Sequence, residues 1–395
     1  MNDLYIAFVG KARSCLNLIT NVATQTTCFS LRISNRKKLL NPVGIMDELS
    51  PDPPFETQYK KLFDMAEANL EQKHKGFPVL EEWCDLPLID LNELNLGDPD
   101  KQQACKKLIS TASQECGFFQ VINHGISSDV LEVMRREQVK LLKKPFLEKI
   151  RSKDLNLGIY QWGTPPANCL EHLSWSESFH IPLSNLELGS AAPARHSLMS
   201  AMAQFAAAMS ELAQAVAEIL AEEIGRPTAL FKQTCVAARC YIRLNRYPPC
   251  PAAYPKMLGI IPHTDSAFLT VVHQDSIGGL QMVNNGRWIA VKPNPSALIV
   301  NIGDLFQAWS NDVYRSVEHR VVANVEKERY SSAYFLCPCQ DTVIESGVYR
   351  SFTFEDYRRQ VQEDVKIYGY KTGLSRFLIA RPGPGPGQSI DSLHE

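Results

Sequence analysis

The feature that most constrains this chain is a series of short apolar segments in its second half. From about residue 236 the texture changes to short runs separated by Pro, Gly and Asn, at 237–244, 267–273, 280–283, 288–291, 297–302, 316–323 and 331–336. Asn284-Asn285-Gly286, between two of them, is a hairpin turn signal. Short strands at this density, with helices mostly before them, predict a β-sandwich or jelly roll flanked by helices.

One long amphipathic helix is expected before these strands. Apolar residues recur at steps of four and three from Leu198 to Ile219, while Gln204, Glu211 and similar polar residues interrupt the stretch and argue against a membrane span. A coiled coil has the same spacing, but Ala fills much of the remaining surface, which favours a helix packed on the core. Other helices are expected over 101–115, 128–149 and 354–367.

Composition limits the partners and the compartment. The 395 residues carry a formal net charge of −2, so neither nucleic acid nor a membrane surface is an expected partner. Eleven scattered cysteines predict a reducing, cytoplasmic location, with nuclear access left open. The sequence does not define an oligomeric state.

The chain divides into five expected parts. Residues 1–75 are expected to be a poorly ordered extension, 80–235 a mainly helical region, 236–345 a jelly-roll domain, 346–380 a helical segment and 381–395 a disordered tail rich in Pro and Gly. Residues 1–45 are basic and rich in Ser and Thr, which suits either a plastid transit peptide or a start upstream of the natural one.

Three residues form a candidate metal site. His263 and Asp265 are two residues apart, so they point to one side of an extended strand, and alternation places His319 on a neighbouring strand. Two imidazoles and one carboxylate with open positions are the ligand set of non-haem Fe(II) oxygenases. His273 and Asp275 repeat the spacing, and a strand-end histidine followed by a turn aspartate is the favoured interpretation of that second pair.

A carboxylate-binding site is expected beside the metal. Arg329 and Ser331 share one face of a strand, where a guanidinium offers two parallel donors to a carboxylate and the hydroxyl adds a third. Asn245 and Tyr247 alternate in the same way and are candidates to complete the pocket.

These motifs, in this order, resemble the plant 2-oxoglutarate- and Fe(II)-dependent dioxygenases over about residues 80–380. Segments such as Tyr160-Gln-Trp-Gly163, Ser174-Trp-Ser-Glu-Ser-Phe-His180 and Gly373-Leu-Ser-Arg-Phe-Leu-Ile379 are similar to the gibberellin 2-oxidases that act on 20-carbon gibberellins. Gibberellin 20-oxidases carry Leu-Pro-Trp-Lys-Glu-Thr where this chain has Leu173-Ser-Trp-Ser-Glu-Ser178, which favours the 2-oxidase interpretation.

The resemblance implies a double-stranded β-helix core and a role for each candidate. The two histidines and the aspartate would bind Fe(II), and Arg329 and Ser331 would hold the distal carboxylate of 2-oxoglutarate, with help from Tyr247 and Asn245. O2 would be the oxidant and ascorbate the reductant, and 2-oxoglutarate would leave as succinate and CO2. The implied reaction is 2β-hydroxylation of a gibberellin, which inactivates the hormone or its precursors.

A gibberellin is a rigid apolar diterpenoid that bears carboxylates, so its pocket should be mainly aromatic and aliphatic. The candidate wall residues are Tyr160, Trp162, Trp175 and Phe179, for which core packing is an equal alternative. Arg246 and Arg376 are candidates for a substrate carboxylate.

Two other functions stay open. Another plant 2-oxoglutarate dioxygenase, such as a gibberellin 20- or 3-oxidase or a flavonoid hydroxylase, would keep the iron and 2-oxoglutarate residues and change the pocket. A non-catalytic jelly-roll protein that binds a ligand has no need for an open metal face beside a carboxylate clamp. The choice between 19- and 20-carbon gibberellins, and the position of hydroxylation, are not fixed by the sequence.

Overall fold

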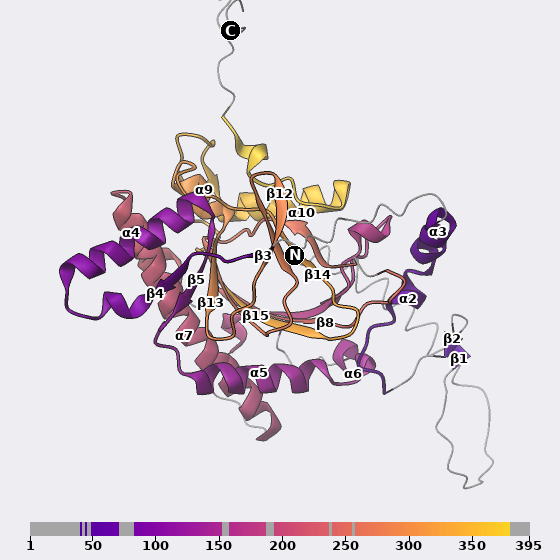
Figure 1. Ribbon diagram of the computed structural model, residues 1–395. Helices are drawn as coiled ribbons and strands as arrows, with labels where there is room; N and C mark the ends of the chain where they lie inside the picture. Colours follow the sequence, from indigo (N-terminus) through magenta and orange to yellow (C-terminus); the bar gives the residue numbers. More distant parts are fainter. Residues whose placement is uncertain are drawn as a thin grey trace, which may run out of the picture. The chain divides into compact units, whose positions relative to one another are not determined.

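A computed structural model describes residues 40–41, 44–45, 49–70, 83–151, 158–186, 193–236, 239–254 and 257–379 (Figure 1). The chain forms two compact units, Met1–Asp47 and Glu48–Glu395. In the first, β1 (Leu40–Asn41) pairs antiparallel with β2 (Gly44–Ile45). The rest of the expected transit segment and the expected tail at 381–395 lie outside the described residues. All that follows concerns the second unit.

The second unit is a jelly roll built from two main sheets. The larger sheet has the order β4-β5-β13-β10-β15-β8-β7-β6 and the smaller has the order β3-β12-β11-β14-β9. Seven strands of the catalytic half were expected, and they are β8 (Tyr241–Tyr247), β10 (Leu269–Gln274), β11 (Leu280–Asn284), β12 (Arg287–Val291), β13 (Leu298–Ile302), β14 (His319–Val322) and β15 (Arg329–Leu336). β9 (Leu258–His263) is added between β8 and β10, and β16 (Val343–Ile344) pairs with β17 (Phe352–Thr353).

The hairpin predicted at 284–286 is confirmed. Asn284 pairs with Arg287, and Asn285 and Gly286 have φ values of 49° and 73°. Two successive left-handed residues are the conformation of the hairpin turn that Asn-Gly favours.

The first half of the unit is less purely helical than expected, because it supplies strands to both sheets. They are β3 (Trp83–Cys84), β4 (Leu88–Asp90), β5 (Phe118–Ile122), β6 (Ile159–Trp162) and β7 (Glu177–Pro182). β5 pairs with β13, and β7 pairs with β8, so the helical region and the jelly roll share one continuous sheet.

Helices cover the outside of the larger sheet. The long helix α7 (Pro193–Glu223) packs on α5, α4, β10 and β15, which confirms a core helix rather than a coiled coil. The other longer helices are α4 (Pro99–Glu115), α5 (Ser128–Leu142) and α10 (Phe354–Tyr368), and the shorter ones are α6 (Phe146–Arg151), α8 (Ala229–Thr234) and α9 (Asp304–Trp309). Figure 1 shows α5 below β8 and β15, and α10 above them.

The prediction of a single helix over 128–149 is wrong, because the helix is interrupted before Pro145. A proline has no N–H and disfavours helical backbone in the residue before it. α5 therefore ends at Leu142, and α6 begins at Phe146 immediately after the proline. None of the helices in the described ranges combines the length and the hydropathy that a bilayer-spanning segment requires.

Residues 49–70, expected to belong to the poorly ordered extension, form two packed helices. They are α2 (Phe55–Gln58) and α3 (Lys60–Leu70). The Phe55 ring stacks on Trp175 with centroids 4.3 Å apart, and Phe63 contacts Trp175 and Tyr254 edge-on. These rings belong to a separate apolar cluster that also contains Leu173 and Met257. The segment is therefore part of the folded unit.

The strand registers divide the larger sheet into an outer and an inner face. Side chains on the outer face, such as Phe179, Ile242, Leu244 and Tyr334, join the apolar core shared with α7. Alternate residues of the same strands point to the inside of the jelly roll. The inner face thus carries the polar residues that build the site.

Three rows of cross-strand neighbours on the inner face matter below. The iron row consists of Asn301, Thr270, Phe335 and Tyr241. The middle row consists of Ile299, Val272, Ala333, Arg243 and His180. The clamp row consists of Gln274, Ser331, Asn245 and Ser178.

Candidate active site

The structure brings the three predicted iron ligands together. β9 ends at His263, which is the cross-strand partner of His319 at the start of β14, and Asp265 follows in the turn after β9. Asp265 Oδ1 lies 3.7 Å from His263 Nε2 and 3.8 Å from His319 Nε2. One ligand atom from each of the three residues lies within 4.8 Å of the others.

Backbone carbonyls orient both imidazoles. His263 Nδ1 donates to the Ile261 carbonyl at 2.9 Å, and His319 Nδ1 donates to the Val317 carbonyl at 3.0 Å. Since a carbonyl can only accept, each Nδ1 carries a proton and each Nε2 is left to face Asp265. Burial, followed by the nearby His319, lowers the pKa of His263 to about 3, so that imidazole is neutral at physiological pH.

Two polar side chains of the iron row fix the carboxylate. Asp265 Oδ2 accepts from Thr270 Oγ1 at 2.6 Å and from Asn301 Nδ2 at 2.8 Å, which leaves Oδ1 facing the two imidazoles. Burial raises the pKa of Asp265, but the two imidazoles and these two hydrogen bonds outweigh it and hold the pKa at about 2. Sequence reasoning missed Thr270 and Asn301. The signal that could have identified them is that each is a polar residue at an inward-facing position of an otherwise apolar strand.

This donor set fits Fe(II). Two imidazole nitrogens and one ionised carboxylate oxygen converge on one point. The other nitrogen of each imidazole and the other oxygen of the carboxylate are held by hydrogen bonds, which fix the orientation of each ligand. Such a set holds an ion on one face and leaves its remaining coordination positions to other ligands.

The predicted clamp residues also meet, and their unused donors fit a carboxylate. Arg329 is 3% exposed and lies over the Tyr247 ring, with its guanidinium carbon 4.8 Å from the ring centroid. Its Nη2 donates to Gln274 Oε1 at 2.7 Å, whereas Nε and Nη1 are buried without a partner in the described structure. Ser331 Oγ, in the next row, accepts from Asn245 Nδ2 at 3.2 Å.

Buried charged donors without an acceptor are costly, so an anion is the natural complement of Arg329. The N–H groups of Nε and Nη1 can donate charge-assisted hydrogen bonds to the oxygens of an anion such as a carboxylate. The distal carboxylate of 2-oxoglutarate has this shape and charge. Gln274, which orients the guanidinium, was not identified from the sequence, where it appeared only inside the second His-x-Asp pattern.

The second His-x-Asp pattern is structural. Asp275 accepts from the backbone N–H groups of Ile277 and Tyr330 and pairs with Arg135 at 3.3 Å, so it closes a turn. His273 follows Val272 on β10 and therefore points to the opposite face from Gln274. Within the described ranges, the one group of metal-ligating side chains that meets contains His263, Asp265 and His319.

A buried network braces the turn that holds the iron ligands. Asp304 Oδ2 accepts from Thr264 Oγ1 at 3.1 Å and from Tyr357, and it pairs with Lys371 Nζ at 2.5 Å. Lys371 also donates to the Thr264 carbonyl at 2.8 Å. The Asp304 N–H donates to the Asp265 carbonyl. The C-terminal segment is thus tied to the backbone between two of the iron ligands.

The structure does not bring the four aromatic wall candidates to this site. Tyr160, Trp162 and Phe179 lie on the outward phase of β6 and β7, and the Tyr160 hydroxyl donates to Glu177 at 2.5 Å. Trp175 packs on Phe55, and its Nε1 donates to the Pro249 carbonyl at 3.1 Å. Their contacts are those of core residues, and contact with a substrate stays a prediction.

The two arginines considered for a substrate carboxylate are engaged within the protein. Arg246 pairs with Glu177 at 2.7 Å, Asp52 at 2.6 Å and Glu328 at 3.0 Å. Arg376 pairs with Asp364 at 3.0 Å. Arg246 lies on the outer face of β8, and its bond to Asp52 anchors the N-terminal segment.

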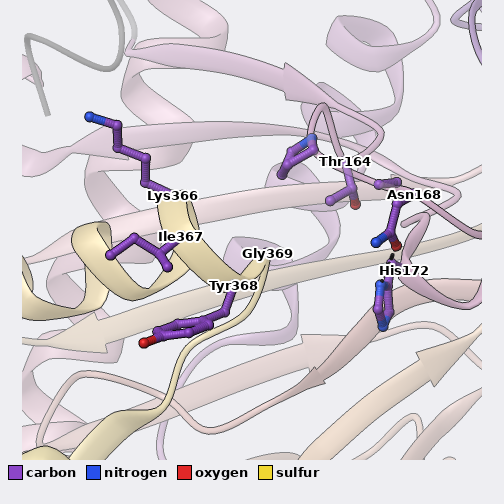
Figure 2. Close-up of a pocket in the computed structure, with 9 residues that line it drawn as sticks. Thr164, Asn168, His172, Lys366, Ile367, Tyr368 and Gly369 are labelled. Atoms are coloured by element: carbon purple, nitrogen blue, oxygen red, sulfur yellow. Dashed lines mark hydrogen bonds between the residues drawn. The ribbon is translucent and has the colours of Figure 1, made fainter.

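A small surface pocket lies apart from these residues. It has a volume of about 200 Å³ and is formed by the loop at 164–172 and the C-terminal end of α10 (Figure 2). Figure 2 shows His172 hydrogen-bonded to Asn168, at 2.9 Å, across from Lys366, Ile367 and Tyr368. It shares no residue with the iron site or the clamp, so we assign it no role in the reaction.

Comparison with known proteins identifies the family. The 2OG-Fe(II) oxygenase superfamily matches residues 238–338, and the family described as non-haem dioxygenase in morphine synthesis N-terminal matches residues 86–200. Gibberellin 2-beta-dioxygenase 8 of Arabidopsis thaliana is 49% identical over 338 residues, which are 83% of this chain and 98% of that protein. The chain belongs to the gibberellin 2-beta-dioxygenase family of 2OG-Fe(II) oxygenases.

Other relatives agree with this placement. Gibberellin 2-beta-dioxygenase 6 of Oryza sativa subsp. japonica is 44% identical over 84% of this enzyme and 97% of its own length. Gibberellin 20 oxidase 1 of Arabidopsis thaliana is more distant, at 34% identity over 67% of this enzyme and 72% of its own length. The crystal structure of JOX2 in complex with 2OG, Fe, and JA superposes with a TM-score of 0.62 at 26% identity, covering 84% of this enzyme and all of that chain.

The family assignment confirms several predictions. The enzyme is a dioxygenase of the jelly-roll fold that uses Fe(II), 2-oxoglutarate and O2. The resemblance to gibberellin 2-oxidases is confirmed, and 20-oxidases are the more distant group.

Proposed function

We propose that this enzyme 2β-hydroxylates gibberellins and so removes them from the growth-active pool. The observation that carries the proposal is 49% identity to a gibberellin 2-beta-dioxygenase along almost its entire length, with an intact ligand set at His263, Asp265 and His319. Fe(II) and 2-oxoglutarate, when bound, supply the chemistry that converts O2, 2-oxoglutarate and substrate into hydroxylated product, succinate and CO2.

The protein's own residues orient these groups. His263 and His319 present their Nε2 atoms, and Thr270 and Asn301 hold Asp265 ionised with Oδ1 toward the metal position. Arg329 would bind the distal carboxylate of 2-oxoglutarate through its guanidinium group, beside Ser331, Asn245 and Tyr247. No protein general base is required for this reaction.

The test is anaerobic reconstitution with Fe(II), followed by O2, ascorbate, 2-oxoglutarate and a panel of 19- and 20-carbon gibberellins. We expect 2β-hydroxylated products by mass spectrometry, in a one-to-one ratio with succinate. Succinate without an oxidised gibberellin would assign the pocket to another molecule. Oxidation at carbon 20 or carbon 3 would favour the rival oxidase activities.

We also propose a cytoplasmic location. Nine cysteines in the described part of the chain are free thiols, which suits a reducing compartment. A fluorescent fusion of the full chain tests this, and accumulation in plastids would instead support a transit role for residues 1–45.

A further inference from the structure

An arginine stands beside the reaction site on the inner face of the larger sheet. Arg243 lies in the middle row, between the iron row, whose Thr270 and Asn301 hold Asp265, and the clamp row that leads to Arg329. Successive rows on one face are about 7 Å apart and neighbouring strands about 4.8 Å apart. Arg243 is two strands from Val272, with only the methyl group of Ala333 between them.

A cluster of three aromatic rings, formed by Phe335, Tyr241 and His180, lies next to this arginine. The Phe335 and Tyr241 rings stack with centroids 4.4 Å apart and 13° between their planes. Tyr241 in turn lies 4.2 Å from the His180 ring, and His180 is the cross-strand neighbour of Arg243. These rings extend from the iron row along the inner face. Their flat apolar surfaces suit the skeleton of a rigid polycyclic substrate.

Two arginines, one on β8 and one on α10, affect the pKa values in this aromatic cluster. Burial, followed by Arg243 and then Arg358 of α10, lowers the pKa of His180 to about 4. The same two guanidinium groups oppose the effect of burial, Cys337 and Asp265 on the pKa of Tyr241, which is nevertheless raised. His180 is therefore neutral at physiological pH. The positive charge near the aromatic cluster comes from Arg243 and Arg358.

The surroundings of Arg243 differ from those of Arg246 on the same strand. Arg246 faces outward and is neutralised by three carboxylates. Arg243 faces inward, and its Nε donates to the neutral hydroxyl of Ser178 at 3.3 Å. In the described ranges no acidic side chain forms an ion pair with Arg243. A partly buried cation that lacks a protein counter-ion favours an anionic ligand.

We propose that Arg243 binds a carboxylate of the substrate while the rings of Phe335, Tyr241 and His180 pack on its apolar skeleton. The inference rests on the proposed function, because Arg243 would supply the contact to a carboxylate that binding of a gibberellin requires. It replaces Arg246 and Arg376 as the candidates for that contact.

The test compares the free acid of the best gibberellin substrate with its methyl ester. In the native enzyme the ester should have the higher KM. Arg243→Gln should raise the KM of the acid about 10- to 100-fold and leave that of the ester within about threefold, which abolishes the preference for the acid. Arg243→Lys keeps the charge but loses the planar guanidinium. Its KM for the acid should lie between those of the native enzyme and Arg243→Gln. Arg239→Gln, an exposed arginine before β8, is the matched control and should change neither KM.

A second measurement separates this role from the 2-oxoglutarate clamp. The Kd of 2-oxoglutarate, measured by anaerobic calorimetry with Mn(II) in place of Fe(II), should stay within about twofold in Arg243→Gln. A parallel loss of 2-oxoglutarate binding would place Arg243 in the clamp and refute the inference. Arg243→Lys, assayed in the same way, gives the readout if Arg243→Gln folds poorly by circular dichroism.

The outcomes distinguish the two proposals. Gibberellin turnover by the native enzyme, with an unchanged acid KM in Arg243→Gln and Arg243→Lys, refutes the inference and leaves the proposed function intact. No product from any gibberellin with the native enzyme refutes the proposed function, and the inference with it.

Discussion

Replacing Lys371 by methionine tests whether the C-terminal brace maintains the iron site. The substitution keeps most of the apolar stem but removes the ammonium, which pairs with Asp304 and donates to the Thr264 carbonyl and to Ser266 Oγ. The side chains of Lys371 and Asp304 are 9% and 3% exposed, so the loss leaves a buried carboxylate without its cation.

The magnitude follows from what remains around that carboxylate. Removing one partner of a buried ion pair costs about 3–5 kcal/mol. Hydroxyl groups of Thr264, Ser316 and Tyr357 still donate to Asp304, so we expect the lower end, about 3 kcal/mol, in the free energy of unfolding. Because the brace fixes the backbone between His263 and Asp265, Fe(II) affinity should also fall about 10- to 100-fold.

Urea unfolding of the metal-free protein, followed by circular dichroism, measures the first effect, and Fe(II) titration measures the second. Lys366→Met is the matched control, since Lys366 is an exposed lysine in the last turn of α10, shortly before Lys371, and it should change stability by less than about 0.5 kcal/mol. A loss below about 1 kcal/mol in Lys371→Met would refute the reasoning, since it would mean that Asp304 does not need the cation. Adding Asp304→Asn to Lys371→Met should recover part of the loss, because it removes the unpaired charge.

Three further predictions follow from the site. His263→Ala should abolish Fe(II) binding and turnover while His273→Ala retains most of both, and the reverse result would sink the iron assignment. Arg329→Ala should raise the Kd of 2-oxoglutarate about 30- to 100-fold by calorimetry, and an unchanged Kd would exclude Arg329 from the clamp. Burial, followed by Arg135, lowers the pKa of His273 from 6.5 to about 4, so the unfolded chain takes up a proton that the folded chain does not. Stability should therefore fall as the pH drops from 6.5 toward 4, and His273→Gln should remove about 1.4 kcal/mol per pH unit of that slope in urea titrations, whereas an unchanged slope would contradict it.

The site was largely predictable because its ligands follow local rules. The two-residue spacing of His263 and Asp265 fixes their common side in extended backbone, and the same rule pairs Arg329 with Ser331. Thr270, Asn301 and Gln274 could not be ranked, since a lone polar residue in a strand reveals its role only when the facing strand is known. Their partners are Asp265 and Arg329, and the register of the strands brings them together.

The parts of the fold that the sequence missed depend on distant partners. β7 contains the polar residues Glu177 and His180, and it forms because β8, more than sixty residues later, pairs with it. Phe55 and Phe63 were hidden in a segment with little apolar periodicity, and their binding surface includes Trp175 and Tyr254. The aromatic wall candidates had no local signal to separate the outer face of β6 and β7 from the inner one.

The link between Asp52 and Arg246 has a consequence for how the protein is made. The two residues are 194 positions apart, so Asp52 leaves the ribosome long before its partner on β8 exists, and Phe55 leaves it long before the Trp175 ring on which it stacks. At synthesis rates of about 5–20 residues per second, the delay is about 10–40 s. Phe55 has no native aromatic ring to cover it until Trp175 has been made, so until then its side chain is open to a chaperone that recognises exposed aromatic residues. The helices α2 and α3 therefore reach their native packing only after much of the chain that follows them has been made.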